Sequence, residues 1–77
     1  MQPNDPDLDH RLLDAHARND KHALIGLYRE AADMSEALQQ IDAACFYLTH
    51  AYVFALDVGA DEARGLHARL KARGREE

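Results

Sequence analysis

The sequence predicts an all-α fold of four antiparallel helices, and three observations indicate it. Alanine is abundant, tryptophan is absent and proline occurs only at Pro3 and Pro6, a composition typical of helical proteins. The stretch 43–58 concentrates apolar and aromatic side chains at helical spacing. No segment alternates apolar and polar residues over the length of a strand, and no Asn-Gly or Asp-Gly pair marks a hairpin turn. We expect residues 1–77 to form a single small helical domain.

The stretch 43–58 is predicted to lie in a long central third helix. When successive residues are placed 100° apart, its main apolar stripe comprises Leu38, Ile41, Cys45, Leu48, Tyr52 and Leu56. Further apolar residues widen this stripe, so we expect neighbouring helices on two sides. The uncharged segment Ala43–Leu56 has 14 residues, whereas a membrane span needs roughly 18–20. A buried core helix is therefore the interpretation, with no membrane contact.

The first half of the chain contains signals for two helices. Residues 1–5 are expected to form a frayed tail, and Pro6 or Asp7 can begin a helix that ends near Arg18–Asn19 with Asn19 as a left-handed cap. Asp20 is a candidate N-cap for a second helix, about Lys21–Ala32. Gly26 inside that helix suggests a close approach between helices.

The second half is predicted to contain the remaining two helices. A turn is expected around Asp33–Ser35, where capping residues precede the long helix that ends at Asp57–Val58 before Gly59. Asp61 is a candidate N-cap for a fourth helix, Glu62–Arg73, which Gly74 would end, and residues 75–77 are expected to be loose. The short connections predict that consecutive helices run antiparallel.

The two halves of the chain also share a layout. In the second half the layout is carried by Leu48, Ala51, Tyr52, Gly59 and Ala63, and in the first half by Leu24, Tyr28 and Ala31. This pattern resembles the helical hairpin of tetratricopeptide-repeat proteins. It departs from that family in two ways: the 51–59 interval is about one turn longer than the family's usual helix, and no proline follows the repeat. The resemblance implies two αα-hairpins, and an ordinary four-helix bundle explains the same periodicity.

Charge and composition limit the classes of function. The net charge of −5 argues against a general nucleic-acid-binding protein. The segment 63–77 is basic, with Arg64, Arg69, Lys71, Arg73 and Arg75, and it is read as a solvated final helix in preference to an anion-binding tail. The single Cys45 cannot form an internal disulfide, and the start MQPNDPD does not follow the pattern of a signal peptide. We therefore expect a cytoplasmic protein.

No catalytic or cofactor-binding motif is found in the sequence. Cys45 and His50 point in different directions on a helix, and the sequence has no phosphate-binding glycine loop, nucleophile elbow or zinc motif. An enzyme, a cofactor and a metal site are therefore not predicted. Five histidines leave one alternative open, a small metal- or ligand-binding protein that uses them on its surface.

A contact surface is the function that the pattern favours. Phe46 and Val53 fall in the polar sector of the central helix together with His50, where the core does not require them. The tetratricopeptide resemblance implies that the first helix of each hairpin binds partners, and there Phe46, His50, Val53 and Phe54 would line the groove. The competing interpretation is that neighbouring helices cover Phe46. We predict a non-catalytic protein–protein interaction module whose partner is another protein or a second copy of itself.

Overall fold

The computed structural model describes residues 6–75 and contains four α-helices. Helix α1 spans Pro6–Ala17, α2 spans Lys21–Ala37, α3 spans Ile41–Val58 and α4 spans Glu62–Ala72. No strand occurs in this part of the chain. The all-α fold and the long third helix are thereby confirmed.

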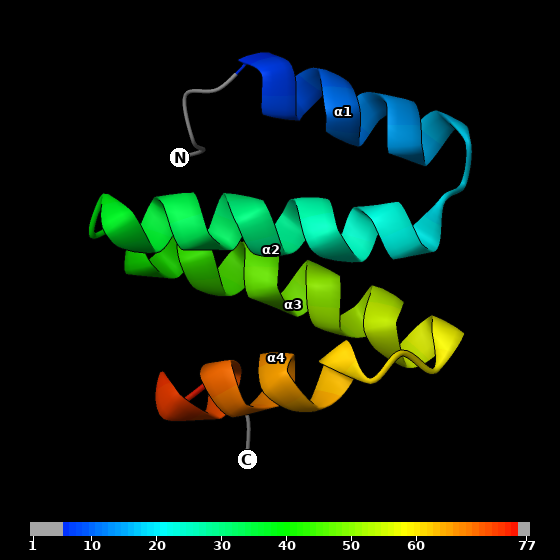
Figure 1. Ribbon diagram of the computed structural model, residues 1–77. Helices are drawn as coiled ribbons and strands as arrows, with labels where there is room; N and C mark the ends of the chain where they lie inside the picture. Colours follow the sequence, from blue (N-terminus) through cyan, green and yellow to red (C-terminus); the bar gives the residue numbers. More distant parts are fainter. Residues whose placement is uncertain (1–5, 76–77) are drawn as a thin grey trace.

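Consecutive helices run antiparallel and lie side by side in chain order (Figure 1). Helices α2 and α3 make the most extensive contact, followed by α3 with α4 and α1 with α2, and no other pair of helices within residues 6–75 approaches closely along the backbone. The result is a flat molecule with extents of 32 × 30 × 13 Å. In so thin a molecule each helix has few neighbours, so side chains on its free face remain open to solvent.

The core is thin and built largely from alanine and leucine. The middle of α3 contributes Ala44, Leu48, Ala51 and Ala55, none of which is exposed to solvent. The other helices pack leucine and alanine side chains onto it: Leu8 and Ala15 from α1, Leu24, Ala31 and Ala32 from α2, and Leu66 and Leu70 from α4. Alanines at the centre allow helix backbones to approach, while the leucines bury most of the apolar area.

Three predicted helix boundaries are confirmed. Asn19 adopts the left-handed conformation with φ of 53° after α1, and the Asp20 carboxylate accepts a hydrogen bond from the backbone N–H of Ala23 at 3.1 Å. Gly59 closes α3 with φ of 68°. Asp61 precedes α4 as expected, but its side chain makes no capping hydrogen bond. These boundaries follow from local chemistry that the sequence displays directly.

The predicted turn at Asp33–Ser35 is wrong, because α2 continues to Ala37. Ser35 is completely buried on the inner stripe that contains Leu24 and Ala31, and its Oγ has no hydrogen-bond partner. Burial of an unpaired hydroxyl is unfavourable, so the apolar members of the stripe keep this segment helical despite its capping residues. The turn occurs at 38–40 instead, where Gln39 takes the left-handed conformation with φ of 62°.

Two other expectations need correction, and one lies partly outside the described residues. Leu38 and Leu56 were predicted on the core stripe of α3 but are 57% and 56% exposed, because Leu38 lies in the turn and the buried arc of α3 is centred on its alanines. A Cβ atom at Gly26 would meet no atom within 4 Å, so no close helix approach requires this glycine. The predicted tail at 1–5 and residues 76–77 of the predicted loose end 75–77 lie outside the described residues, whereas the Arg75 backbone N–H donates to the Leu70 carbonyl oxygen and its side chain pairs with Asp42.

Candidate functional site

The candidate site is the outer face of α3, which we define as Asp42, Phe46, Thr49, His50, Val53 and Asp57. At 100° per residue these positions lie opposite the buried alanines of α3. Phe46 is 59% exposed and Val53 is 55% exposed. The interpretation that neighbouring helices cover Phe46 is therefore wrong. An exposed phenylalanine beside an exposed valine is an apolar patch of the kind found at contact surfaces.

A cluster of aromatic rings supports one edge of this face. The Phe46 ring lies 4.5 Å from the His50 ring between centroids, and His50 lies 5.0 Å from Tyr28 on α2. Tyr28 also stacks on Phe54 at 6.0 Å, and Phe54 contacts His16 of α1 at 6.2 Å. The cluster joins three helices, so it holds His50 and Phe54 in fixed positions beside the patch.

Of the four predicted site residues, the structure therefore gathers three on the outer face and places the fourth beside it. Phe46, His50 and Val53 belong to the face, whereas Phe54 is half-buried and packs toward α2 and α1. A depression of about 190 Å³ lies between Thr49, His50, Val53 and Phe54. Phe54 thus forms one wall of this depression and does not belong to the exposed outer face.

Tyr28 and His16 belong to this cluster and were not predicted. The Tyr28 hydroxyl and His16 Nε2 are hydrogen-bonded at 2.9 Å, and burial raises the pKa of Tyr28, so the phenol remains neutral at physiological pH. Both residues lie on helices other than α3, and only the tertiary packing brings them to the site. The aromatic character of Tyr28 on the second helix was the available signal, and the sequence pattern used it only for the repeat layout.

The polar groups near the middle of the face are satisfied by their own helix. The Thr49 hydroxyl donates to the Cys45 carbonyl oxygen at 2.9 Å. His50 Nδ1 lies 3.0 Å from the Phe46 carbonyl oxygen, and since that oxygen can only accept, Nδ1 carries the proton. Thr49 can therefore be covered by a partner with little loss of hydrogen bonding, whereas His50 Nε2 would need a donor from the partner or from water.

An ion pair stands at each end of the face. At its start Arg75 Nη2 lies 2.7 Å from Asp42 Oδ1, and at its end Lys21 Nζ pairs with the Asp57 carboxylate. Both pairs are exposed, so each contributes little to stability. Each end of the face therefore holds one positive and one negative group, and the exposed Phe46 and Val53 lie between the two ends.

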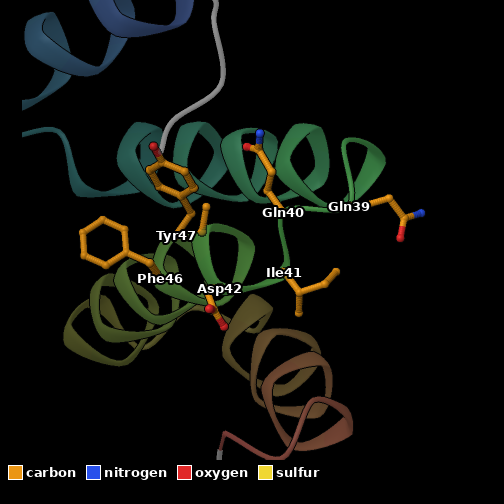
Figure 2. Close-up of a pocket in the computed structure, with 7 residues that line it drawn as sticks. Gln39, Gln40, Ile41, Asp42, Phe46 and Tyr47 are labelled. Atoms are coloured by element: carbon orange, nitrogen blue, oxygen red, sulfur yellow. The ribbon is translucent and has the colours of Figure 1, made fainter.

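A wider depression of about 600 Å³ lies at the turn between α2 and α3. Figure 2 shows Tyr47 and Gln40 on one side of it, whereas Phe46 projects away from α2. Gln40 Oε1 is buried without a hydrogen-bond partner. The depression adjoins the outer face of α3 through Phe46 and widens the surface that a partner could contact.

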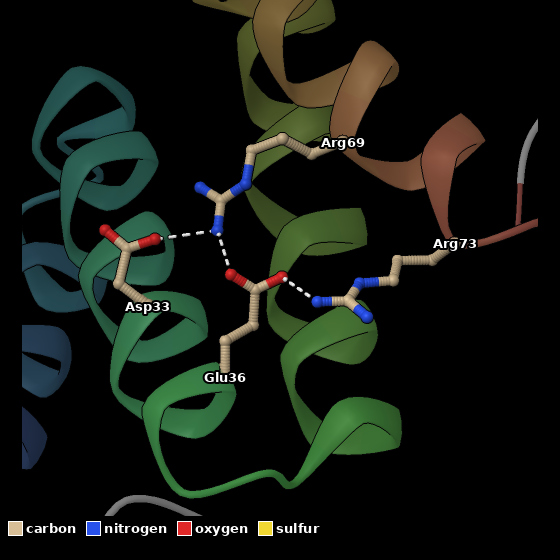
Figure 3. A network of polar contacts seen from close by, with 4 residues as sticks. All are labelled: Asp33, Glu36, Arg69 and Arg73. Atoms are coloured by element: carbon tan, nitrogen blue, oxygen red, sulfur yellow. Dashed lines mark hydrogen bonds and ion pairs between the residues drawn. The ribbon is translucent and has the colours of Figure 1, made fainter.

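The basic C-terminal segment remains largely exposed, and ion pairs join it to the acidic part of the chain. Arg69 on α4 contacts Asp33 Oδ1 at 2.7 Å and Glu36 Oε1 at 2.8 Å on α2, and Arg73 contacts Glu36 at 3.2 Å (Figure 3). Burial would lower the pKa of Arg69, but the hydrogen bonds to Asp33 and Glu36 raise it above its ordinary value. These arginines are occupied within the chain.

Cys45 and His50 do not form a nucleophile–base pair, and residues 6–75 contain no cluster of metal-ligating side chains. Cys45 is buried and His50 faces away from it. No group of three or more His, Cys, Asp or Glu side chains within residues 6–75 could hold a metal ion. His67 packs on Tyr52, far around α3 from His50. The alternative of a histidine metal site gains no support here.

Helix α3 meets the length and composition of a membrane span at their lower limit. This is weak support, because the core helix of a globular domain meets the same criteria. Six residues of α3 are buried against the rest of the chain, and Asp42 and Asp57 are exposed at its ends. Packing within the chain thus accounts for part of the apolar character of α3, whereas Phe46, Val53 and Leu56 remain exposed.

Comparison with known proteins finds no protein-family model, no curated protein and no solved structure that matches this chain.

Proposed function

We propose that the chain is a small, non-catalytic protein–protein interaction module that associates with itself through the outer face of α3. One observation carries the proposal: Phe46 and Val53 remain more than half exposed in a chain whose core has few large side chains to bury. Exposed apolar area of this kind is unfavourable in water and is removed when a partner covers it. The ring cluster around His50 favours such a partner because the surface is already ordered before binding.

The proposal involves no cofactor, nucleic acid or membrane. Three of the five basic residues in 63–77 already pair with carboxylates of the chain, which leaves little positive charge for phosphates. The buried, unpaired thiol of Cys45 suits a reducing compartment, so the cytoplasm is the proposed location. The paired-hairpin arrangement of the tetratricopeptide type remains part of the proposal, supported by the antiparallel succession of the four helices.

Substitution of Phe46 by aspartate tests the proposal. We expect sedimentation velocity to show concentration-dependent dimerisation of the wild-type chain and a monomeric Phe46→Asp variant with unchanged helicity and melting temperature. A charge at an exposed position does not disturb the core but opposes burial in an interface. Leu13→Asp is the matched control, because Leu13 is 67% exposed on α1 and should leave the dimer intact.

Two results would contradict the proposal. One is a wild-type chain that sediments as a monomer up to about 1 mM, where even weak specific contacts form. The other is a Phe46→Asp variant that unfolds, which would make Phe46 a core residue.

A further inference from the structure

We propose that the partner of the outer face is a second copy of the chain whose α3 runs antiparallel to the first, with a two-fold axis beside the Thr49–His50 peptide bond. The arrangement rests on the proposed self-association and specifies its geometry. In a two-fold interface both copies use the same patch. If one residue of the first copy contacts a different residue of the second, the reverse contact is made on the other side of the axis.

The order of residues on the face fits this symmetry. Phe46 and Val53 lie at equal distances from the centre of the Thr49–His50 pair, and so do Asp42 and Asp57. At about 1.5 Å per residue, these distances are roughly 5 Å and roughly 11 Å along the helix. An antiparallel copy therefore brings Phe46 against Val53 of the second copy on both sides of the axis.

The sizes of the side chains favour the antiparallel direction. It sets the large Phe46 ring against the smaller valine at two equivalent places, and such alternation of large and small residues fills an interface evenly. A parallel pairing would set two phenylalanines against each other and leave the two valines facing across a gap. The antiparallel direction also aligns the helix dipoles favourably.

The charges at the ends of α3 balance in this arrangement. The Lys21–Asp57 pair of one copy lies opposite the Arg75–Asp42 pair of the other. Each end of the interface then holds two positive and two negative groups, so neither end carries a net charge that would oppose the pairing. At the centre, Thr49 and His50 Nδ1 already have hydrogen bonds to their own helix, and Thr49 tolerates contact with the second copy.

The contact is small, which sets the strength of the dimer. One helix packed on another lies below the roughly 1,200 Å² of a standard interface, so the dimer should be weak and form at concentrations of about 0.1–1 mM. Phe54, which forms one wall of the depression beside Thr49, His50 and Val53, adds contact area in each copy. Experiments must therefore work at high concentration or trap the dimer covalently.

Disulfide trapping tests the direction. In a Cys45→Ala background, Asp42→Cys and Asp57→Cys variants are made separately and oxidised under glutathione buffer, alone and as a mixture. Antiparallel pairing predicts a mixed disulfide between the two variants at least about tenfold above the self-linked products. The reason is that residue 42 of one copy lies roughly 22 Å along the helix from residue 42 of the other copy, too far for a disulfide. Leu13→Cys, exposed on α1, measures random collision.

The outcomes separate this arrangement from the proposed function. A dominant mixed disulfide, with Leu13→Cys at background, supports the antiparallel pairing. Self-linked Asp42→Cys and Asp57→Cys products would overturn it and indicate a parallel pair, while the outer face would still be the contact. Background crosslinking in all samples, with a wild-type dimer that Phe46→Asp abolishes, would overturn the α3–α3 pairing alone. A wild-type chain that stays monomeric would overturn both proposals.

Discussion

Replacement of Gln39 by glycine should stabilise the protein. Gln39 occupies the turn between α2 and α3 with φ of 62°, and its side chain is exposed, so the substitution loses little packing. The left-handed conformation costs an L-residue roughly 1–2 kcal/mol. Glycine removes this cost but adds about 0.4–1 kcal/mol of entropy to the unfolded chain. The net gain is about 0.5–1 kcal/mol in the free energy of unfolding.

Thermal unfolding followed by circular dichroism measures this gain. For a domain of this size, 0.5–1 kcal/mol corresponds to a rise in melting temperature of about 3–6 °C. Gln39→Ala is the matched control: it removes the same side chain but keeps the Cβ atom, so its melting temperature should match that of the wild type. Gly59→Ala should lower the melting temperature by a similar amount, since Gly59 has φ of 68° and no neighbouring atom would obstruct a Cβ.

An equal effect of Gln39→Gly and Gln39→Ala would refute the argument. The side chain, not the backbone conformation, would then decide the stability of the turn. A melting temperature that falls in Gln39→Gly would mean that the entropy of the unfolded chain outweighs the strain.

Two further predictions concern the core and the helix cap. Leu48→Ala should lower the free energy of unfolding by about 2–5 kcal/mol, because Leu48 is fully buried. Leu56→Ala should change it by less than about 0.5 kcal/mol, because Leu56 is exposed. Urea titration measures both, and equal losses would show that Leu56 is a core residue. Hydrogen bonding from the Ala23 backbone N–H lowers the pKa of Asp20 below its ordinary 3.8, so its contribution is complete above that pH and is lost as pH falls through the lowered pKa. Asp20→Ala should therefore melt below the wild type at neutral pH, and the difference should shrink in acid; a difference that does not change with pH would show that ionisation of Asp20 has no part in the cap.

Helix ends with distinctive residues could be predicted, and the end of α2 could not. Asn19 and Gly59 tolerate positive φ, and Asp20 has a carboxylate that caps α2, so local chemistry located these boundaries. The segment 33–35 contains capping residues too, but α2 continues through it to Ala37, because apolar packing along its inner stripe outweighs their preference. The real turn has no glycine, asparagine or proline, and Gln39 takes a conformation that glutamine rarely adopts.

The residues of the candidate site that lie on α3 could be predicted from the sequence, and those on other helices could not. The 100° spacing correctly separated Phe46 and Val53 from the buried side of α3. It placed Leu56 in the core, because helical spacing cannot tell how wide an arc the neighbouring helices cover. It also could not find Tyr28 and His16, since contacts between helices depend on packing angles that the sequence pattern does not specify.

The chain-order packing of the four helices has a consequence for how the protein folds and opens. Because close backbone contacts join only consecutive helices within residues 6–75, every native hairpin closes a short loop, and the low contact order places folding in the range of about microseconds to milliseconds. The terminal helices α1 and α4 each lie against one neighbour along the backbone, so either can detach while α2 and α3 stay paired. The α2–α3 hairpin is then the last part to lose its amide protons to exchange, and the outer face of α3 survives these openings intact.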